Sequence, residues 1–306
     1  MHTILITGAS GFVATHMIRS LNAQKFKRVY CLSRPESKGA LPASENQTVK
    51  FIRGNLLDGR PYERELAAAD IVVHLAAATG KAKREEYFRT NVEGTRILTE
   101  NCRRLGVPKF LYVSSIAVQF PDKNRYYYAQ SKTEAEEVVR SSGLQFTILR
   151  PTIILGRNAP AWKPLAALAR LPIIPIPGDG KTLIQPIAVE DVVNFILRVI
   201  ERDAFRGDTL ELGGPQAISM EEFLKKIHLL WHGTHPRTIR IPLAPLLPVL
   251  VILETLFGSL MPVTVGQLSS FRFDGTTTKN WLVEEASPRL QTIDEMLASL
   301  CAPDGD

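Results

Sequence analysis

Residues 7–14 read Thr7-Gly8-Ala9-Ser10-Gly11-Phe12-Val13-Ala14, and this stretch decides the fold. It follows an apolar β-branched run and opens a run of helical periodicity, where a dinucleotide-binding loop would lie between a strand and a helix. Gly8 permits the tight turn, Gly11 lets the backbone approach a pyrophosphate, and the helix N-terminus offers amide groups to an anion. Alanine replaces the third glycine of the pattern and is still small enough for close packing. The alternative is a glycine-rich turn without a ligand; we favour a dinucleotide site that includes Gly8, Ser10, Gly11, Phe12 and Val13.

Short apolar runs alternate with longer helical runs through the first half of the chain. This alternation is typical of βαβ units and of a parallel sheet covered on both faces. We therefore predict an α/β protein with a doubly wound parallel Rossmann sheet and a smaller, mostly helical C-terminal lobe. The predicted strands are 3–7, 28–33, 49–53, 71–75, 110–114 and 146–150, and the predicted helices are 12–23, 85–105 and 127–141.

The alternation becomes irregular and rich in proline after Pro151. Helical periodicity returns at 190–201 and at 220–230. We expect an NAD(P)-binding Rossmann domain over 1–155, to which 184–215 returns. The segments 156–183 and 216–306 are expected to form a substrate and C-terminal lobe.

The formal charge of +6 comes from 37 Lys and Arg against 31 Asp and Glu, and the basic residues are scattered. Without a basic arm or interleaved aromatic residues, nucleic acid is not expected as a partner. A basic cleft for a phosphorylated cofactor explains the charge more simply. Cys31, Cys102 and Cys301 lack metal-ligand spacing and are expected to be reduced thiols, the histidines show no ligand spacing either, and no metal is expected. A strand that begins by residue 3 leaves no room for a signal peptide, so we expect a cytoplasmic protein.

The segment 241–261 is apolar but contains Pro242, Pro245, Pro248 and Glu254. A bilayer span needs about 20 apolar residues, and three prolines and a carboxylate argue against a simple span. A buried helix of the small lobe is favoured. The alternative is a surface helix that contacts a membrane or a protein partner.

The end of the predicted second strand bears on the choice between NADP and NAD. Proteins that prefer NAD usually place a carboxylate there, to accept hydrogen bonds from the ribose hydroxyls. This chain has Ser33 and Arg34 instead, and a guanidinium suits a phosphate. NADP is therefore favoured, and NAD stays open if Arg34 is only a solvated charge near Glu36.

Tyr128 and Lys132 are four residues apart in a predicted helix, which places both side chains on one face. A nearby ammonium favours the phenolate and would lower the tyrosine pKa from about 10. The pair is therefore a candidate proton donor and acceptor.

Five motifs in order resemble the extended short-chain dehydrogenase/reductase family, also called the NAD-dependent epimerase/dehydratase family, over most of residues 1–230. They are Thr7-Gly8 to Gly11, His74-Leu75-Ala76-Ala77, Asn91-Val92-Glu93-Gly94-Thr95, Ser114-Ser115 and Tyr128 to Lys132.

The resemblance implies roles for individual residues. Tyr128 would be the general acid and base, Lys132 would bind the nicotinamide ribose, and Ser115 would hydrogen-bond the substrate oxygen. Asn91 would brace the site, and His74 is interpreted as structural. For the cofactor, Asn55 and Leu56 would contact adenine, Leu75, Ala76 and Ala77 would line its middle, and Pro151 and Ile153 would lie at its nicotinamide end.

The first functional hypothesis is an oxidoreductase or epimerase that acts on a carbonyl or alcohol carbon of a sugar nucleotide or another small molecule. Dehydratases of the family carry an acidic pair where this chain has Ile116-Ala117, which disfavours dehydration. Substrate contacts are expected from the loops 79–84, 119–126 and 155–163.

The second hypothesis is a non-catalytic NADPH-binding protein. Leu212-Gly213-Gly214-Pro215 and the apolar tail resemble the branch that contains the reductase-like accessory subunit of respiratory complex I. The presence of Tyr128, Lys132 and Ser115 favours an enzyme. By analogy with relatives, a homodimer through 85–105 and 127–141 is expected.

Overall fold

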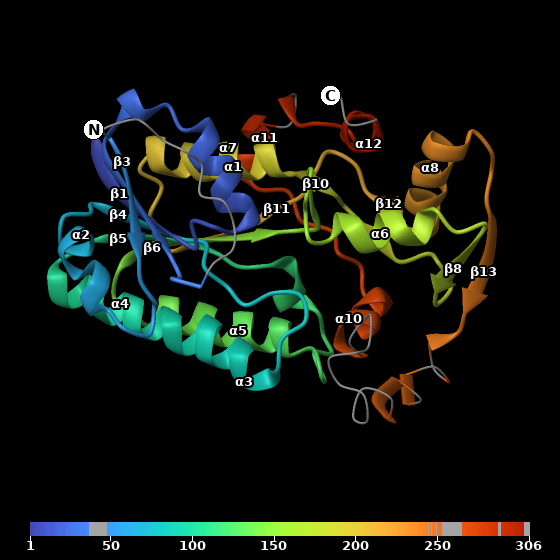
Figure 1. Ribbon diagram of the computed structural model, residues 1–306, viewed down its shortest axis with the longest axis horizontal. Coiled ribbons are helices and arrows are strands. Elements are labelled where there is room, and N and C mark those ends of the chain that lie inside the picture. Colours follow the sequence, from blue (N-terminus) through green and yellow to red (C-terminus); the bar gives the residue numbers. More distant parts are fainter. Residues whose placement is uncertain are drawn as a thin grey trace. The chain divides into compact units, whose positions relative to one another are not determined.

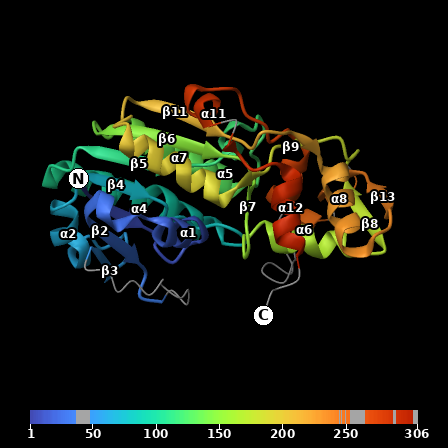
Figure 2. The same ribbon diagram turned by 90° about the horizontal axis from the view of Figure 1, so that it is seen from above.

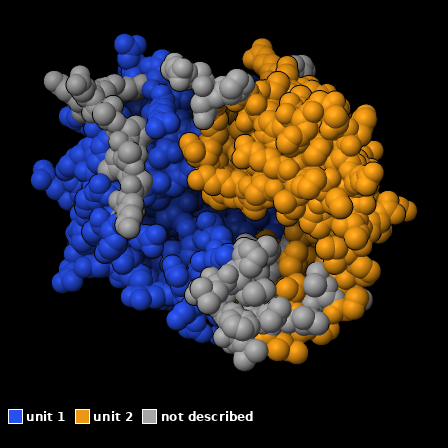
Figure 3. All heavy atoms as spheres, turned by 45° about the vertical axis from the view of Figure 1, so that its right-hand side comes forward, with its two compact units in different colours: residues 1–118, 128–150, 192–210 blue, residues 119–127, 151–191, 211–306 orange. Residues whose placement is uncertain are grey.

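The structure is a computed structural model that describes residues 1–36, 48–243, 245, 247–248, 250–252, 265–286 and 289–302. The chain divides into two compact units, coloured separately in Figure 3. Unit 1 comprises Met1–Val118, Tyr128–Arg150 and Val192–Leu210. Unit 2 comprises Gln119–Tyr127, Pro151–Asp191 and Glu211–Asp306.

A seven-stranded sheet has the order β11-β6-β5-β4-β1-β2-β3. The pairs β1–β2, β2–β3, β1–β4, β4–β5 and β5–β6 are all parallel. The strand order reverses between β1 and β4, which confirms the doubly wound Rossmann prediction. The strands are β1 (His2–Thr7), β2 (Phe26–Ser33), β3 (Val49–Arg53), β4 (Ile71–His74), β5 (Lys109–Val113), β6 (Gln145–Pro151) and β11 (Asp208–Leu212).

The prediction of six strands was one short, because β11 joins the sheet beside β6. This strand arrives late, after helix α7 (Val189–Glu201). Only Leu210 and Leu212 of its five residues are buried, as is usual for an edge strand with one covered face. Its apolar pattern was therefore too short to identify by periodicity.

Helices cover both faces of the sheet in unit 1. α1 (Phe12–Ser20) and α7 lie over one face, and α4 (Gly94–Leu105) and α5 (Tyr127–Arg140) lie over the other (Figures 1 and 2). Leu98 of α4 and Val139 of α5 belong to the buried core cluster that includes Phe110 of β5. The short elements are η1 (Ala23–Lys25), η2 (Arg60–Tyr62), α2 (Glu63–Ala67) and η4 (Ile116–Gln119).

The single helix predicted over 85–105 is divided into three parts. α3 (Arg84–Tyr87) is followed by the π-helical segment η3 (Phe88–Glu93) and then by α4. π-Helical turns widen a helix by one residue and are frequent at functional sites. The segment contains Asn91, which the sequence identified as a candidate site residue.

Unit 2 combines helices with two-stranded sheets. β8 (Ile173–Pro177) pairs in parallel with β13 (Arg237–Ile241), β7 (Ile154–Leu155) with β10 (Ile187–Ala188), and β9 (Leu183–Ile184) is antiparallel to β12 (Ile218–Ser219). The described helices of unit 2 include α6 (Trp162–Ala169), α8 (Met220–His232), α10 (Val265–Ser269), η6 (Ser270–Arg272), α11 (Trp281–Ala286) and α12 (Ile293–Cys301).

The apolar segment 241–261 lies partly outside the described residues, at 244, 246, 249 and 253–261. Within the part of the chain that the structure describes, no helix combines the length and apolar character that a bilayer span requires. Contact of this segment with a membrane surface or a partner stays a prediction.

Candidate active site

The loop after β1 needs glycine at position 8 for two separate reasons, its backbone conformation and the space beside it. Gly8 has a φ of +71°, and a Cβ atom built there would lie 2.7 Å from the backbone nitrogen and Cα of Ala76. The Gly11 amide donates to the Gly8 carbonyl at 2.8 Å, which closes the turn. Gly11 is the extended N-cap of α1, and no side chain caps this helix. A tight turn that ends in an uncapped helix N-terminus suits a pyrophosphate.

Gly8→Ala is expected to weaken NADPH binding about tenfold or more, because the new Cβ must displace Ala76. A cost of only about 1.4 kcal/mol in binding free energy already gives a tenfold change. The measurement is nicotinamide fluorescence titration. The matched control is Gly106→Ala, because Gly106 also has a positive φ, +77°, but an added Cβ meets no atom within 4 Å. The control should lose about 1 kcal/mol of stability to backbone strain and keep NADPH binding. Equal NADPH affinity in both variants would contradict the role of the loop.

A cavity of about 640 Å³ lies along this edge of the sheet, entirely within unit 1. Its size lies in the range of cofactor sites. Nine of the predicted cofactor residues line it: Gly8, Ser10, Gly11, Arg34, Asn55, Leu56, Leu75, Ala76 and Ala77. Phe12 and Val13 open α1 and are not among the lining residues. The lining residues that the predicted set did not include are Leu32, Ser33, Gly54, Leu57, Lys83, Glu85, Glu86, Arg89 and Thr90.

Arg34 lines the cavity, and Arg53, which is not among the lining residues, lies next to Arg34. Ser33 and Arg53 are partners in the parallel register of β2 and β3. The Arg53 guanidinium donates to the Ser33 hydroxyl at 3.2 Å and to the Arg34 carbonyl at 3.3 Å. Sequence analysis missed Arg53. Ser33 and Arg53 are the last residues of two predicted strands, and this shared position at the strand ends was the signal that could have placed them side by side.

The structure brings Ser115, Tyr128 and Lys132 together in unit 1. Ser115 follows β5, Tyr128 is the second residue of α5, and the Ser115 side chain acts on the Tyr128 phenol. Lys132 is only 2% exposed. Its ammonium nitrogen donates to the Val113 carbonyl at 2.7 Å and lies 4.2 Å from the ring centroid of Tyr112. The catalytic roles of the three residues stay predictions.

The expected lowering of the tyrosine pKa was wrong for the chain without ligands. Burial raises the pKa of Tyr128 to about 12, and the effect of the Ser115 side chain opposes this increase. Burial also lowers the pKa of Lys132 to about 7. The ammonium is directed to the Val113 carbonyl, and burial outweighs the other influences on the phenol. Tyr128 is therefore a protonated phenol at neutral pH, which suits a proton donor.

Asn91 connects three parts of the site. Its side-chain oxygen accepts from the Ala78 amide at 2.7 Å, and its side-chain nitrogen donates to the Ser131 hydroxyl at 2.9 Å. That hydroxyl in turn donates to the carbonyl of Tyr128 at 2.8 Å. The predicted bracing residue thus ties the loop after β4 to the turn of α5 that carries Tyr128.

His74 is fully buried and hydrogen-bonded on both sides. Its Nδ1 lies 2.7 Å from the Thr7 hydroxyl, and its Nε2 lies 2.9 Å from the Thr95 hydroxyl. Thr95 donates its proton to the Asn91 carbonyl, so the Thr95 oxygen accepts from Nε2–H, and Thr7 donates to Nδ1. Burial lowers the pKa of His74 to about 3, which keeps the ring neutral. These contacts describe a structural histidine.

Residues 4–213 match the NAD dependent epimerase/dehydratase family. The chain is 29% identical over 249 residues to a ceramide reductase from Caulobacter vibrioides, covering 78% of this chain and 73% of the relative. It is 25% identical over 283 residues to a 2-alkyl-3-oxoalkanoate reductase from Shewanella oneidensis, covering 82% and 72%. The solved structure of MoeE5 with UDP-glucuronic acid and NAD has a TM-score of 0.72 and 23% identity, covering 98% of this chain and 97% of that one.

The chain belongs to the NAD dependent epimerase/dehydratase family. It is therefore a nicotinamide-dependent oxidoreductase or epimerase of the extended short-chain dehydrogenase/reductase type. The likeness to MoeE5 agrees with the Rossmann fold.

Two predicted cofactor residues and two predicted substrate loops belong to unit 2. Pro151 is the last residue of β6, and Ile153 precedes β7. The loops 119–126 and 155–163 lie in the same unit. The predicted roles of Pro151 and Ile153 at the nicotinamide, and of the two loops toward a substrate, stay predictions.

Proposed function

We propose that the chain is an NADPH-dependent oxidoreductase that reduces a carbonyl carbon to an alcohol, with Tyr128 as the proton donor. The observation that carries the proposal is that the Ser115 side chain acts on the Tyr128 phenol, with Lys132 one helical turn away. A phenol and a hydroxyl that meet in this way can donate to a single carbonyl oxygen. Asn91 fixes the turn of α5 from which the phenol projects.

The residues of unit 1 fit a dinucleotide. A Cβ at Gly8 would occupy the space beside Ala76 where the loop turns, and the uncapped N-terminus of α1 suits the pyrophosphate. Arg34 lines the cavity, and the Arg53 guanidinium lies at the same strand ends, a pairing that suits the 2′-phosphate of NADP. When bound, the reduced dinucleotide supplies the hydride that the protein cannot. Tyr128 gives its proton to the substrate oxygen, and Ser115 orients that oxygen.

For the substrate we propose a ketone attached to a long hydrocarbon chain. The 2-alkyl-3-oxoalkanoate reductase is named for a ketone that carries alkyl chains, and the ceramide reductase is named for a lipid with long hydrocarbon chains. Unit 2 contains a cavity of about 440 Å³ lined by leucine, proline and valine residues together with Asp122, Asn124, Arg125 and Arg272. A hydrocarbon chain gains free energy by leaving water for the apolar part of such a surface. The apolar residues are Leu243, Leu247, Pro248, Val251 and Val265.

The test is NADPH oxidation, followed by absorbance, with a panel of long-chain 3-oxo compounds and of UDP and dTDP sugars. Turnover of a long-chain ketone with NADPH, and weaker turnover with NADH, is expected. Turnover of only the sugar nucleotides would reject the substrate class. NADPH binding without turnover of any compound would favour the alternative of a non-catalytic NADPH-binding protein.

A further inference from the structure

A third residue on the active-site face of α5 is a buried carboxylate. Glu136 follows Lys132 by four residues, as Lys132 follows Tyr128, so the three side chains lie on one side of the helix. Glu136 is only 1% exposed. A buried carboxylate is stable only where charged partners and hydrogen bonds replace water.

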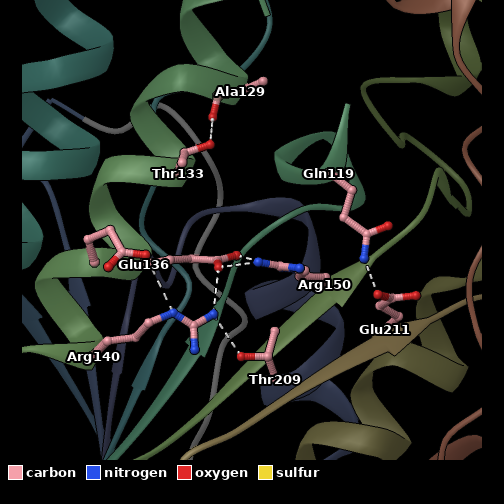
Figure 4. A network of polar contacts seen from close by, with 9 residues as sticks. Gln119, Ala129, Thr133, Glu136, Arg140, Arg150, Thr209 and Glu211 are labelled. Carbon is pink, nitrogen blue, oxygen red and sulfur yellow. Dashed lines mark hydrogen bonds and ion pairs between the residues drawn. The ribbon is translucent and has the colours of Figure 1, made fainter. Parts of the chain in front are cut away.

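Two arginines supply these partners (Figure 4). Arg150 donates from Nε to one carboxylate oxygen at 2.9 Å and from Nη2 to the other at 2.6 Å. Arg140 donates from Nη2 to the second oxygen at 3.0 Å and to the Thr209 hydroxyl at 2.9 Å. Arg150 lies in β6 and Thr209 in β11. The carboxylate therefore connects α5 to both strands at this side of the sheet.

The same carboxylate acts on Lys132. Burial lowers the pKa of Lys132, and the negative charge of Glu136 opposes that effect. The other groups that face the ammonium are the Tyr112 ring and the Val113 carbonyl from β5, with His74 from β4. Tyr112 and His74 are both neutral at pH 7, because burial raises the pKa of Tyr112 and lowers that of His74. Of these groups, Glu136 alone brings a negative charge.

We propose that Glu136 is a positioning residue: clamped by Arg150 and Arg140, it fixes the face of α5 that carries Tyr128 and Lys132, and it places a negative charge one helical turn from the Lys132 ammonium. The proposal rests on the proposed function of Tyr128 and Lys132, and it deepens it. A charged ammonium is needed there because it attracts the ribose hydroxyls of a dinucleotide and stabilises the phenolate that remains after proton transfer.

A clamp that is merely structural would affect stability alone, so the test measures the titration of Lys132 itself. Protein labelled with ¹³C at the lysine ε-carbon is titrated by NMR without substrate, and Lys132→Arg assigns the signal. In Glu136→Gln, the midpoint of Lys132 should fall by roughly one pH unit, the lower end of the effect of a close opposite charge. As Lys132 loses its proton with increasing pH, the NADPH dissociation constant should rise, and in Glu136→Gln this rise should begin at a lower pH than in the wild type.

The matched control is Glu137→Gln, which removes the same charge from the next residue of α5. The Glu137 side chain is 72% exposed and lies 3.7 Å from Arg140, so water screens its charge and the Lys132 midpoint should not move. An unchanged midpoint in Glu136→Gln, or an equal shift in the control, overturns the proposal.

Arg140→Gln keeps the proposal falsifiable if Glu136→Gln does not fold. It removes one cation from the carboxylate while leaving the bidentate contact with Arg150. The Lys132 midpoint should then move to higher pH, the opposite direction from Glu136→Gln, and a shift to lower pH would contradict the proposal. Because these titrations need no substrate, failure to find turnover would count against the proposed function and would leave this result interpretable.

Discussion

Tyr128→Phe should lower kcat for carbonyl reduction by a factor of about 10² to 10⁴, the usual contribution of a positioned general acid. The variant removes only the hydroxyl that we propose as the proton donor and on which the Ser115 side chain acts. The ring keeps its edge contact with Tyr87, at 6.1 Å between centroids, so the helix should stay in place. Because the cofactor cavity is lined by other residues, the NADPH dissociation constant should stay within about twofold, well under the tenfold that 1.4 kcal/mol represents.

The control for this variant is Tyr127→Phe, which removes the same hydroxyl from the preceding residue. Successive residues of a helix point in different directions, so Tyr127 does not share the face of Tyr128 and Lys132. Stopped-flow measurement of a single turnover separates the chemical step from product release. If Tyr128→Phe reduces the ketone at the wild-type rate, or if Tyr127→Phe is equally slow, Tyr128 is not the proton donor.

The parts of the site that sequence could predict are those built from local patterns. The loop at Gly8 to Gly11 was identified because one strand, one turn and one helix start are contiguous in the chain. Tyr128 and Lys132 were identified because a spacing of four defines a helix face. The six predicted strands all lie in the sheet, with bounds that differ by at most two residues, and the seventh strand is β11, a short edge strand.

The parts that could not be predicted depend on pairing between distant segments. Arg53 acquires its place from the register of β3 against β2, where it meets Ser33. In the sequence, Glu136 cannot be distinguished from other carboxylates of the same helix. Only the fold buries it and places Arg150 of β6 beside it. The predicted direction of the Tyr128 pKa shift was wrong for the same reason, since burial is a property of the folded chain.

Cofactor choice should depend on the two arginines at the ends of β2 and β3. Arg34→Ala combined with Arg53→Ala is expected to raise the NADPH dissociation constant about 100-fold, since each charge-assisted hydrogen bond to phosphate contributes about 1.5 kcal/mol or more. The NADH dissociation constant should change by less than about threefold, within 0.7 kcal/mol, because NADH has no 2′-phosphate for these residues to contact. Fluorescence titration with both dinucleotides measures the change in selectivity.

Arg53 also donates to Ser33 and to the Arg34 carbonyl, so its loss could loosen the strand ends themselves. Thermal unfolding of the double variant would detect loosened strand ends as lower stability. Loosened strand ends would also weaken the binding of NADH and NADPH alike, whereas a lost phosphate contact would weaken the binding of NADPH alone. Arg19→Ala removes an equal charge from the last turn of α1 and should leave both affinities unchanged. Equal affinity of the wild-type protein for the two dinucleotides would contradict a phosphate site at Arg34 and Arg53.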